Sequence, residues 1–131
     1  MIKSYTDLEQ SKKLAEILPL ESADMYYFRQ IDNDYFPPDI ESICPIPLFK
    51  DGKEDFNYDI RCWSLAALLG VVPKHIKDYN VLRIDISEND TSIWYDEIGY
   101  GVNNDLPDIT TESAVDACYE MILKLHEQNL L

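Results

Sequence analysis

The chain has 131 residues and a formal net charge of −14, with 46% hydrophobic residues and only 4 glycines. This length suits one ordinary domain with its own core, and the composition excludes disorder throughout the chain. No lysine or arginine occurs from residue 84 to 123, so direct binding to nucleic acid or to an anionic membrane surface is not expected, because both need basic charge.

A helix is the first predicted element. The run Thr6-Asp7-Leu8-Glu9 matches a capping box, in which Thr6 accepts from the Glu9 N–H and Glu9 reaches back. An apolar stripe follows before Pro19 ends the helix, and it comprises Leu8, Leu14, Ala15, Ile17 and Leu18. Residues 23–31 are rich in aromatic side chains and alternate in part, which predicts a strand.

Residues 33–53 predict a long extended segment laid across the domain. Four prolines exclude a helix and interrupt any sheet ladder, whereas the isoleucines, Leu48 and Phe49 are apolar enough to need cover. The tip of this segment is a possible partner contact, because an aromatic pair beside two prolines is stiff. It consists of Tyr35, Phe36, Pro37 and Pro38. The alternative is a passive connector.

The second half of the sequence gives clearer patterns. Residues 56–61 weakly indicate a strand, and residues 62–69 predict a short buried helix that Gly70 and Pro73 stop. Alternation over 81–100 predicts a β-hairpin with its turn at 88–91. Thr110, Thr111 or Ser113 is expected to cap a last helix, which buries Val115, Cys118, Ile122 and Leu125. On this helix Glu120 and Lys124 are expected to pair.

These elements predict an α+β fold in a single domain over residues 1–131. Three helices are expected to pack against a small antiparallel β-sheet, with the 81–100 hairpin as its firmest part.

No motif predicts a catalytic, cofactor-binding or metal-binding residue, and no cofactor is expected. His75 and His126 suit surface or helix-end positions. Cys62 and Cys118 lie among apolar neighbours and are expected to be buried and inert, whereas Cys44, before Pro45, is expected to be more accessible. Residues 32–34 begin like a calcium loop, but the third ligand and the glycine for the turn are missing.

The number of cysteines is odd, and the three are widely spaced in the sequence. The first residues do not show the signal-peptide pattern of a basic start followed by an apolar run. A reducing cytoplasm with free thiols is the simplest expectation. No apolar stretch approaches the roughly 20 residues that a membrane-spanning helix needs.

Three stretches resemble a group of small uncharacterised proteins encoded by gut Bacteroidales and their prophages or mobile elements. They are residues 8–14, residues 63–69 with Pro73, and residues 115–131, about a third of the chain. That group has no known activity to carry over to any residue. The resemblance implies a bacterial or phage protein of the cytoplasm.

The leading hypothesis is a non-enzymatic interaction protein of a phage or mobile element, which binds another protein through an acidic or aromatic surface. The partner is unknown, and a basic protein would match the charge. One alternative is a DNA mimic, whose carboxylates occupy the phosphate sites of a basic nucleic-acid-binding protein; this requires dense carboxylates on one face. Another is a small enzyme with an unrecognised site, in which a histidine meets Cys44 or two carboxylates meet.

Overall fold

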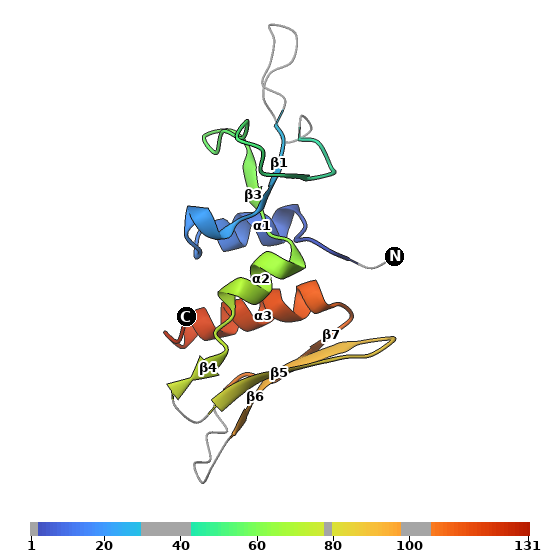
Figure 1. Ribbon diagram of the computed structural model, residues 1–131, viewed down its shortest axis with the longest axis vertical. Coiled ribbons are helices and arrows are strands. Elements are labelled where there is room, and N and C mark those ends of the chain that lie inside the picture. Colours follow the sequence, from blue (N-terminus) through green and yellow to red (C-terminus); the bar gives the residue numbers. More distant parts are fainter. Residues whose placement is uncertain (1–2, 30–42, 78–79, 98–105) are drawn as a thin grey trace, which may run out of the picture. The chain divides into compact units, whose positions relative to one another are not determined.

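A computed structural model describes residues 3–29, 43–77, 80–97 and 106–131. In this part of the chain three α-helices and two antiparallel sheets are present, which confirms the α+β class, with two sheets where one was expected (Figure 1). The chain divides into two compact units. We call Tyr5–Ala67 the N-terminal unit, and Leu68–Leu131 with Met1–Ser4 the C-terminal unit.

The N-terminal unit contains a small sheet of order β2-β1-β3, beside helix α1. Its elements are α1 (Leu8–Ala15), the 3-10 helix η1 (Leu20–Ser22), β1 (Met25–Tyr27), β2 (Leu48–Phe49) and β3 (Ile60–Cys62). All three residues of the central strand β1 are buried, so the strand predicted over 23–31 is present but does not have one exposed face. Beyond residue 29 that prediction lies outside the described residues.

Helix α1 begins one residue later than the sequence pattern predicted. Asp7 is the N-cap and forms a capping box with Gln10, in place of the expected pair Thr6 and Glu9. The Thr6 hydroxyl is instead buried, accepting from the Trp63 N–H at 3.1 Å and lying 2.8 Å from the Ser11 hydroxyl. Threonine and aspartate can both fill the N-cap position, so Asp7 caps the helix while the Thr6 hydroxyl makes this tertiary contact.

Strand β3 is fixed to the far end of α1 by a charged side chain. The Arg61 guanidinium donates to the carbonyl oxygens of Ala15 at 3.1 Å and Leu18 at 3.4 Å. The Ala15 carbonyl lies at the end of the helix, where a cation complements the helix dipole, and Leu18 follows in the next turn of chain. The strand predicted over 56–61 is thus real but shifted, since residues 56–58 form a turn and the strand is Ile60–Cys62.

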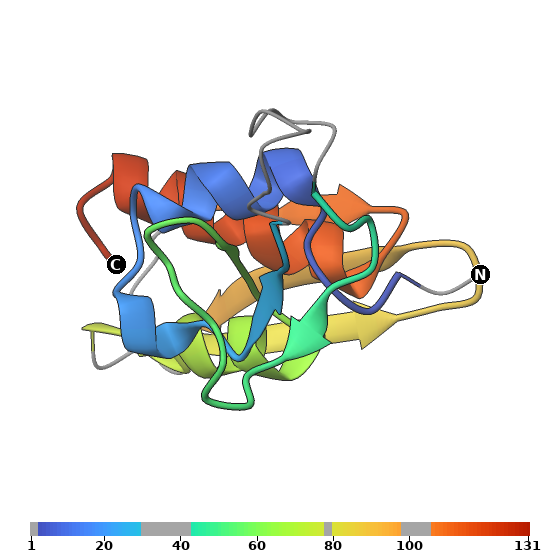
Figure 2. The ribbon, with the colours of Figure 1, turned by 90° about the horizontal axis from the view of Figure 1, so that it is seen from above.

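The C-terminal unit is a four-stranded antiparallel sheet of order β4-β5-β6-β7, with α3 packed against β6 and β7. Its elements are β4 (His75–Ile76), β5 (Asn80–Ile86), β6 (Thr91–Glu97), β7 (Ile109–Thr111) and α3 (Ala114–Glu127). The predicted hairpin is confirmed as β5 and β6, whose register pairs Leu82 with Tyr95 and Ile84 with Ile93, and residues 98–100 of that prediction lie outside the described residues. Its tip extends past the first turn of α3 (Figures 1 and 2).

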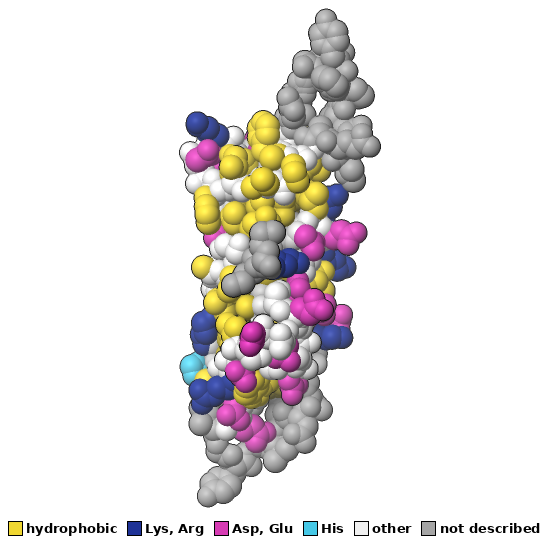
Figure 3. Space-filling model, turned by 90° about the vertical axis from the view of Figure 1, so that its right-hand side faces the viewer, with side chains coloured by type: hydrophobic (Ala, Val, Ile, Leu, Met, Phe, Trp, Pro, Cys, Tyr) yellow, Lys and Arg dark blue, Asp and Glu magenta, His cyan; other side chains and the backbone are white. Residues whose placement is uncertain are grey.

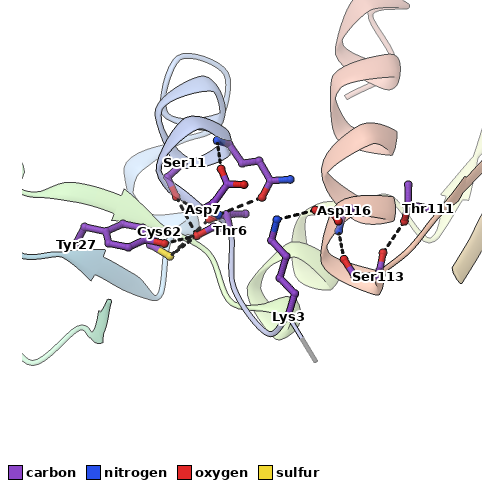
Figure 4. Close-up of polar contacts among 10 residues, drawn as sticks. Lys3, Thr6, Asp7, Ser11, Tyr27, Cys62, Thr111, Ser113 and Asp116 are labelled. Atoms are coloured by element: carbon purple, nitrogen blue, oxygen red, sulfur yellow. Dashed lines mark hydrogen bonds and ion pairs between the residues drawn. The ribbon is translucent and has the colours of Figure 1, made fainter. Parts of the chain in front are cut away.

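Helix α3 follows its predicted pattern closely. Ser113, one of three expected caps, accepts from the Asp116 N–H at 3.1 Å (Figure 4). Its buried side chains are Val115, Ala117, Cys118, Met121, Ile122 and Leu125. The expected ion pair of Lys124 with Glu120 is wrong, because the Lys124 Nζ lies 3.9 Å from the Glu127 carboxylate instead.

Helix α2 (Leu65–Val71) differs most from expectation. Cys62 belongs to β3, so the helix starts three residues later than predicted and runs through Gly70 to end at Val71. Leu68 is its one buried residue, so a helix buried all round is wrong. The division between the two units falls within this helix, after Ala67.

We expect Leu68→Ala to lower the free energy of unfolding by about 2–5 kcal/mol, because Leu68 is 0% exposed and truncation leaves a cavity. Urea denaturation followed by circular dichroism measures this loss. Leu131→Ala is the control, since that side chain is 43% exposed and should change stability little. A loss under about half a kcal/mol for Leu68→Ala would show that the site tolerates truncation like a surface position.

Candidate protein-interaction site

A proline-containing bulge interrupts the pairing between β1 and the chain segment from 43 to 50. The Cys44 N–H donates to the Phe28 carbonyl at 2.9 Å, and the Lys50 N–H donates to the Asp24 carbonyl at 3.0 Å. Between these bonds Leu48 pairs with Tyr26, so residues 45–47 all face the single residue Tyr27. Pro45 and Pro47 lie where the ladder is already broken, because proline has no N–H to donate.

The apolar side chains of this bulged segment are mostly exposed. Ile46 is 65% exposed, Leu48 is 49% exposed and Phe49 is 65% exposed, whereas Ile43 is buried. The prediction that the isoleucines, Leu48 and Phe49 need cover is wrong for these three side chains. Backbone hydrogen bonds and the buried side chains of Ile43 and Pro47 hold the segment in place. Figure 3 shows apolar side chains gathered over this unit.

Two further aromatic side chains of the same unit are also exposed. Phe28, the residue after β1, is 46% exposed, and Tyr58 is 47% exposed. Phe28 is joined to the bulged segment directly, because its carbonyl accepts from Cys44. Exposed apolar side chains gather on the side of this unit that Figure 3 shows, and such a gathering on a monomer marks an interaction site.

A hollow of about 450 Å³ lies beside the bulge. Its lining residues are Tyr5, Asp7, Leu8, Glu9, Tyr27 and Pro45. The apolar part comes from three separate stretches of chain, namely the start of α1, strand β1 and the bulge. Two carboxylates, Asp7 and Glu9, come from the beginning of α1. The hollow therefore suits an apolar group with a positive charge beside it.

A buried polar cluster fixes the walls of this hollow (Figure 4). The Tyr27 hydroxyl donates to the Thr6 carbonyl at 2.7 Å, and the Cys62 thiol donates to the same oxygen at 3.4 Å. Burial raises the pKa of Tyr27 above its usual value, so this hydroxyl stays protonated and remains a donor. The cluster ties β1 and β3 to the residue that precedes α1, and so positions Tyr27 against Leu8.

The three cysteines lie where the sequence pattern predicted. All are free; Cys44 is exposed, whereas Cys62 and Cys118 are buried. Burial raises the pKa of the Cys118 thiol to about 11, and burial also raises the pKa of the Cys62 thiol. Because the thiolate is the reactive form, both buried thiols are poor nucleophiles near neutral pH.

The ionisable residues considered for chemistry do not form a site in the described part of the chain. Side chains of His75 and His126 are exposed and make no hydrogen bond or ion pair to a cysteine among the described residues. No group of three potential metal ligands comes together in residues 3–29, 43–77, 80–97 and 106–131. Within those ranges no helix is long and apolar enough to cross a membrane.

The predicted contact residues Tyr35, Phe36, Pro37 and Pro38 lie outside the described residues. Sequence reasoning missed the exposed part of the bulged segment, because it equated apolar character with burial. The one available signal was the pair Pro45 and Pro47 on either side of Ile46, since such a pattern favours an interrupted edge over a continuous strand.

Comparison with known proteins does not assign the chain to a family. No protein-family model, no curated protein and no solved structure matches this chain.

We expect Cys44 alone to react rapidly with Ellman's reagent at pH 8, because the raised pKa values leave Cys62 and Cys118 with less thiolate and both are buried. The two slow thiols should become reactive only when denaturant is added. Cys44→Ser is the matched variant and should remove the fast phase alone. A fast phase that survives this substitution would show that a buried thiol is accessible in the folded protein.

Proposed function

We propose that this protein is a non-enzymatic interaction protein that binds another protein through the bulged segment and the adjoining hollow of its N-terminal unit. The observation that carries the proposal is the exposure of Ile46, Leu48 and Phe49 on a segment that backbone hydrogen bonds already hold in place. Aromatic and apolar anchors dominate the binding energy of interfaces, and a segment held before binding loses less entropy.

The hollow supports a particular chemistry for the partner. An apolar side chain would fill the space between Leu8, Tyr27 and Pro45, while a basic group would lie against Asp7 and Glu9. This arrangement matches the net charge of −14, which favours encounter with a basic protein. The origin in a phage or mobile element and the cytoplasmic location belong to the same proposal, and the resemblance and the cysteine usage described above support them.

The DNA-mimic alternative stays a prediction with less support. Several carboxylates of the N-terminal unit accept hydrogen bonds from the protein's own backbone: those of Asp7, Asp24, Asp51, Asp55 and Asp59. In the C-terminal unit Asp96 lies 3.6 Å from Arg83 and Asp116 lies 2.8 Å from Lys3. Each of these acids has a role in a turn, a cap or an ion pair, so its presence needs no mimicry to explain it. The small-enzyme alternative likewise stays a prediction.

We expect the double variant Ile46→Ser and Phe49→Ser to lose binding to the partner that the wild-type protein captures from a lysate of its host. Each truncation of an interface anchor costs on the order of 1–2 kcal/mol, so the pair should weaken binding by at least roughly tenfold. Affinity capture with quantitative mass spectrometry, followed by titration of the purified partner, measures this.

Leu20→Ser is the control, because Leu20 is 47% exposed and lies on η1, away from β2 in Figures 1 and 2. It changes the same kind of side chain and should leave binding unchanged. Equal capture by all three proteins would remove the bulged segment from the interface.

A further inference from the structure

Strand β5 of the C-terminal unit has an open edge beyond β4. The Leu82 N–H donates to the Lys74 carbonyl at 2.9 Å, on the side away from β6. Because backbone groups alternate along a strand, the N–H and C=O of Ile84 and Ile86 point to that same side. Strand β4 pairs only with Asn80 and Val81, so these groups have no backbone partner among the described residues.

The side chains along this edge are apolar on one face of the sheet. Ile84 lies opposite Ile93, and Ile86 lies opposite Thr91, on the face that α3 covers. Because the hairpin extends past α3, Ile84 is 36% exposed and Ile86 is 64% exposed. An unpaired edge with exposed isoleucines is a ready template for another strand.

The opposite face of the same edge carries Asp85 and Arg83, and Arg83 is already paired with Asp96 at 3.6 Å. Asp85 borders a hollow of about 360 Å³, whose other lining residues are Ser92, Trp94, Asp108 and Thr110. The two carboxylates come from β5 and from the residue before β7, on either side of Trp94 in the middle strand β6. Carboxylates beside an indole ring form a favourable environment for an ammonium or guanidinium group.

A second copy of this chain fits the edge poorly in the two antiparallel registers that place Ile84 opposite an isoleucine. If Ile84 paired with Ile86 of the copy, Asp85 would lie opposite Asp85 of the copy, and like charges directly opposite are destabilising. If Ile84 paired with Ile84 of the copy, Ile86 of the copy would lie opposite Leu82, where Lys74 is already bonded. In the register that pairs Ile84 with the first apolar residue and Ile86 with the second, a partner with a basic side chain at the central position replaces the repulsion at Asp85 by attraction.

We propose that the β5 edge from Arg83 to Ile86 binds an extended segment of another protein with an apolar–basic–apolar pattern. The segment adds a strand to the sheet. Its two apolar side chains lie against Ile84 and Ile86, while its lysine or arginine lies on the other face beside Asp85 and points toward the Trp94 hollow. This site is additional to the interaction surface of the N-terminal unit.

A short capped peptide that alternates valine and lysine is a direct probe. Titrated into the full-length protein, it should bind saturably and slow the exchange of the Ile84 and Ile86 amide hydrogens, as measured by NMR. A peptide with glutamate in place of the central lysine should bind roughly fivefold more weakly or worse, as expected for loss of an exposed ion pair and its replacement by repulsion.

Substitution in the protein should reverse this preference. Asp85→Lys should favour the glutamate peptide over the lysine peptide, whereas Glu21→Lys, with the same change of charge on η1, should keep the wild-type preference. If Asp85→Lys fails to fold, the wild-type protein still gives a test, because methylation of the peptide nitrogens that face Ile84 and Ile86 should abolish binding.

Three results would overturn the proposal: no saturable peptide binding, equal binding of the lysine and glutamate peptides, or unchanged exchange at Ile84 and Ile86. A dimer in sedimentation experiments that dissociates on Ile86→Pro would also overturn it, since the edge would then take a second copy. None of these results concerns the bulged segment, so the proposed function is judged separately.

Discussion

Backbone hydrogen bonds between residues 24–29 and the 43–50 segment are the constraint on which the N-terminal unit depends. They pair the chain on both sides of the 45–47 bulge, at Cys44 before it and from Leu48 to Lys50 after it, and the prolines of the bulge need no N–H partner. Because these bonds and the buried Ile43 and Pro47 hold the segment, its other apolar side chains can face solvent. Ile46 and Phe49 are each 65% exposed as a result, and this unusual exposure is the basis of the proposed interaction surface.

The polar cluster around Thr6 has a related role. Tyr27, Cys62 and Ser11 all bond to this one buried residue, so the start of α1 is joined to both β1 and β3. Buried polar groups of this kind are costly unless satisfied, and here the Thr6 carbonyl and hydroxyl are both bonded. The hollow between α1 and the bulge therefore has fixed walls. The C-terminal unit offers a different kind of surface, in which a strand edge without a backbone partner in the described part of the chain lies between exposed isoleucines and a hollow lined by Asp85 and Asp108.

Periodicity predicted the elements whose stabilising contacts are local or regular. The β5–β6 hairpin alternates strictly, and α3 carries both a cap at Ser113 and an apolar stripe at helical spacing. Periodicity predicted the structure less well where contacts between distant residues determine the bounds of an element. Thr6 resembles an N-cap, but its hydroxyl bonds to Trp63, more than fifty residues away, so Asp7 takes the cap. The apolar run that begins at Cys62 resembles one helix, but Cys62 belongs to strand β3, where it pairs with Met25 of β1.

The candidate site was the least predictable part of the molecule. Apolar composition predicts burial on average, and it gave no reason to expect Leu48 and Phe49 at a sheet edge. The hollow also combines Tyr5, Tyr27 and Pro45, which are far apart in sequence, so no spacing rule could have joined them. The sequence did indicate that the strand pairing is interrupted in this segment, because Pro45 and Pro47 cannot take part in a continuous ladder.

Amide hydrogen exchange of the free protein, followed residue by residue by NMR, tests the central claim most directly. If backbone bonds hold the bulged segment, the Cys44 and Lys50 amides should exchange slowly, as part of the sheet, while the Ile46 amide at the bulge exchanges rapidly. Exchange of Cys44 and Lys50 at the rate of an unfolded peptide would contradict the account, because the apolar side chains would then belong to an unfixed loop and not to a preorganised surface.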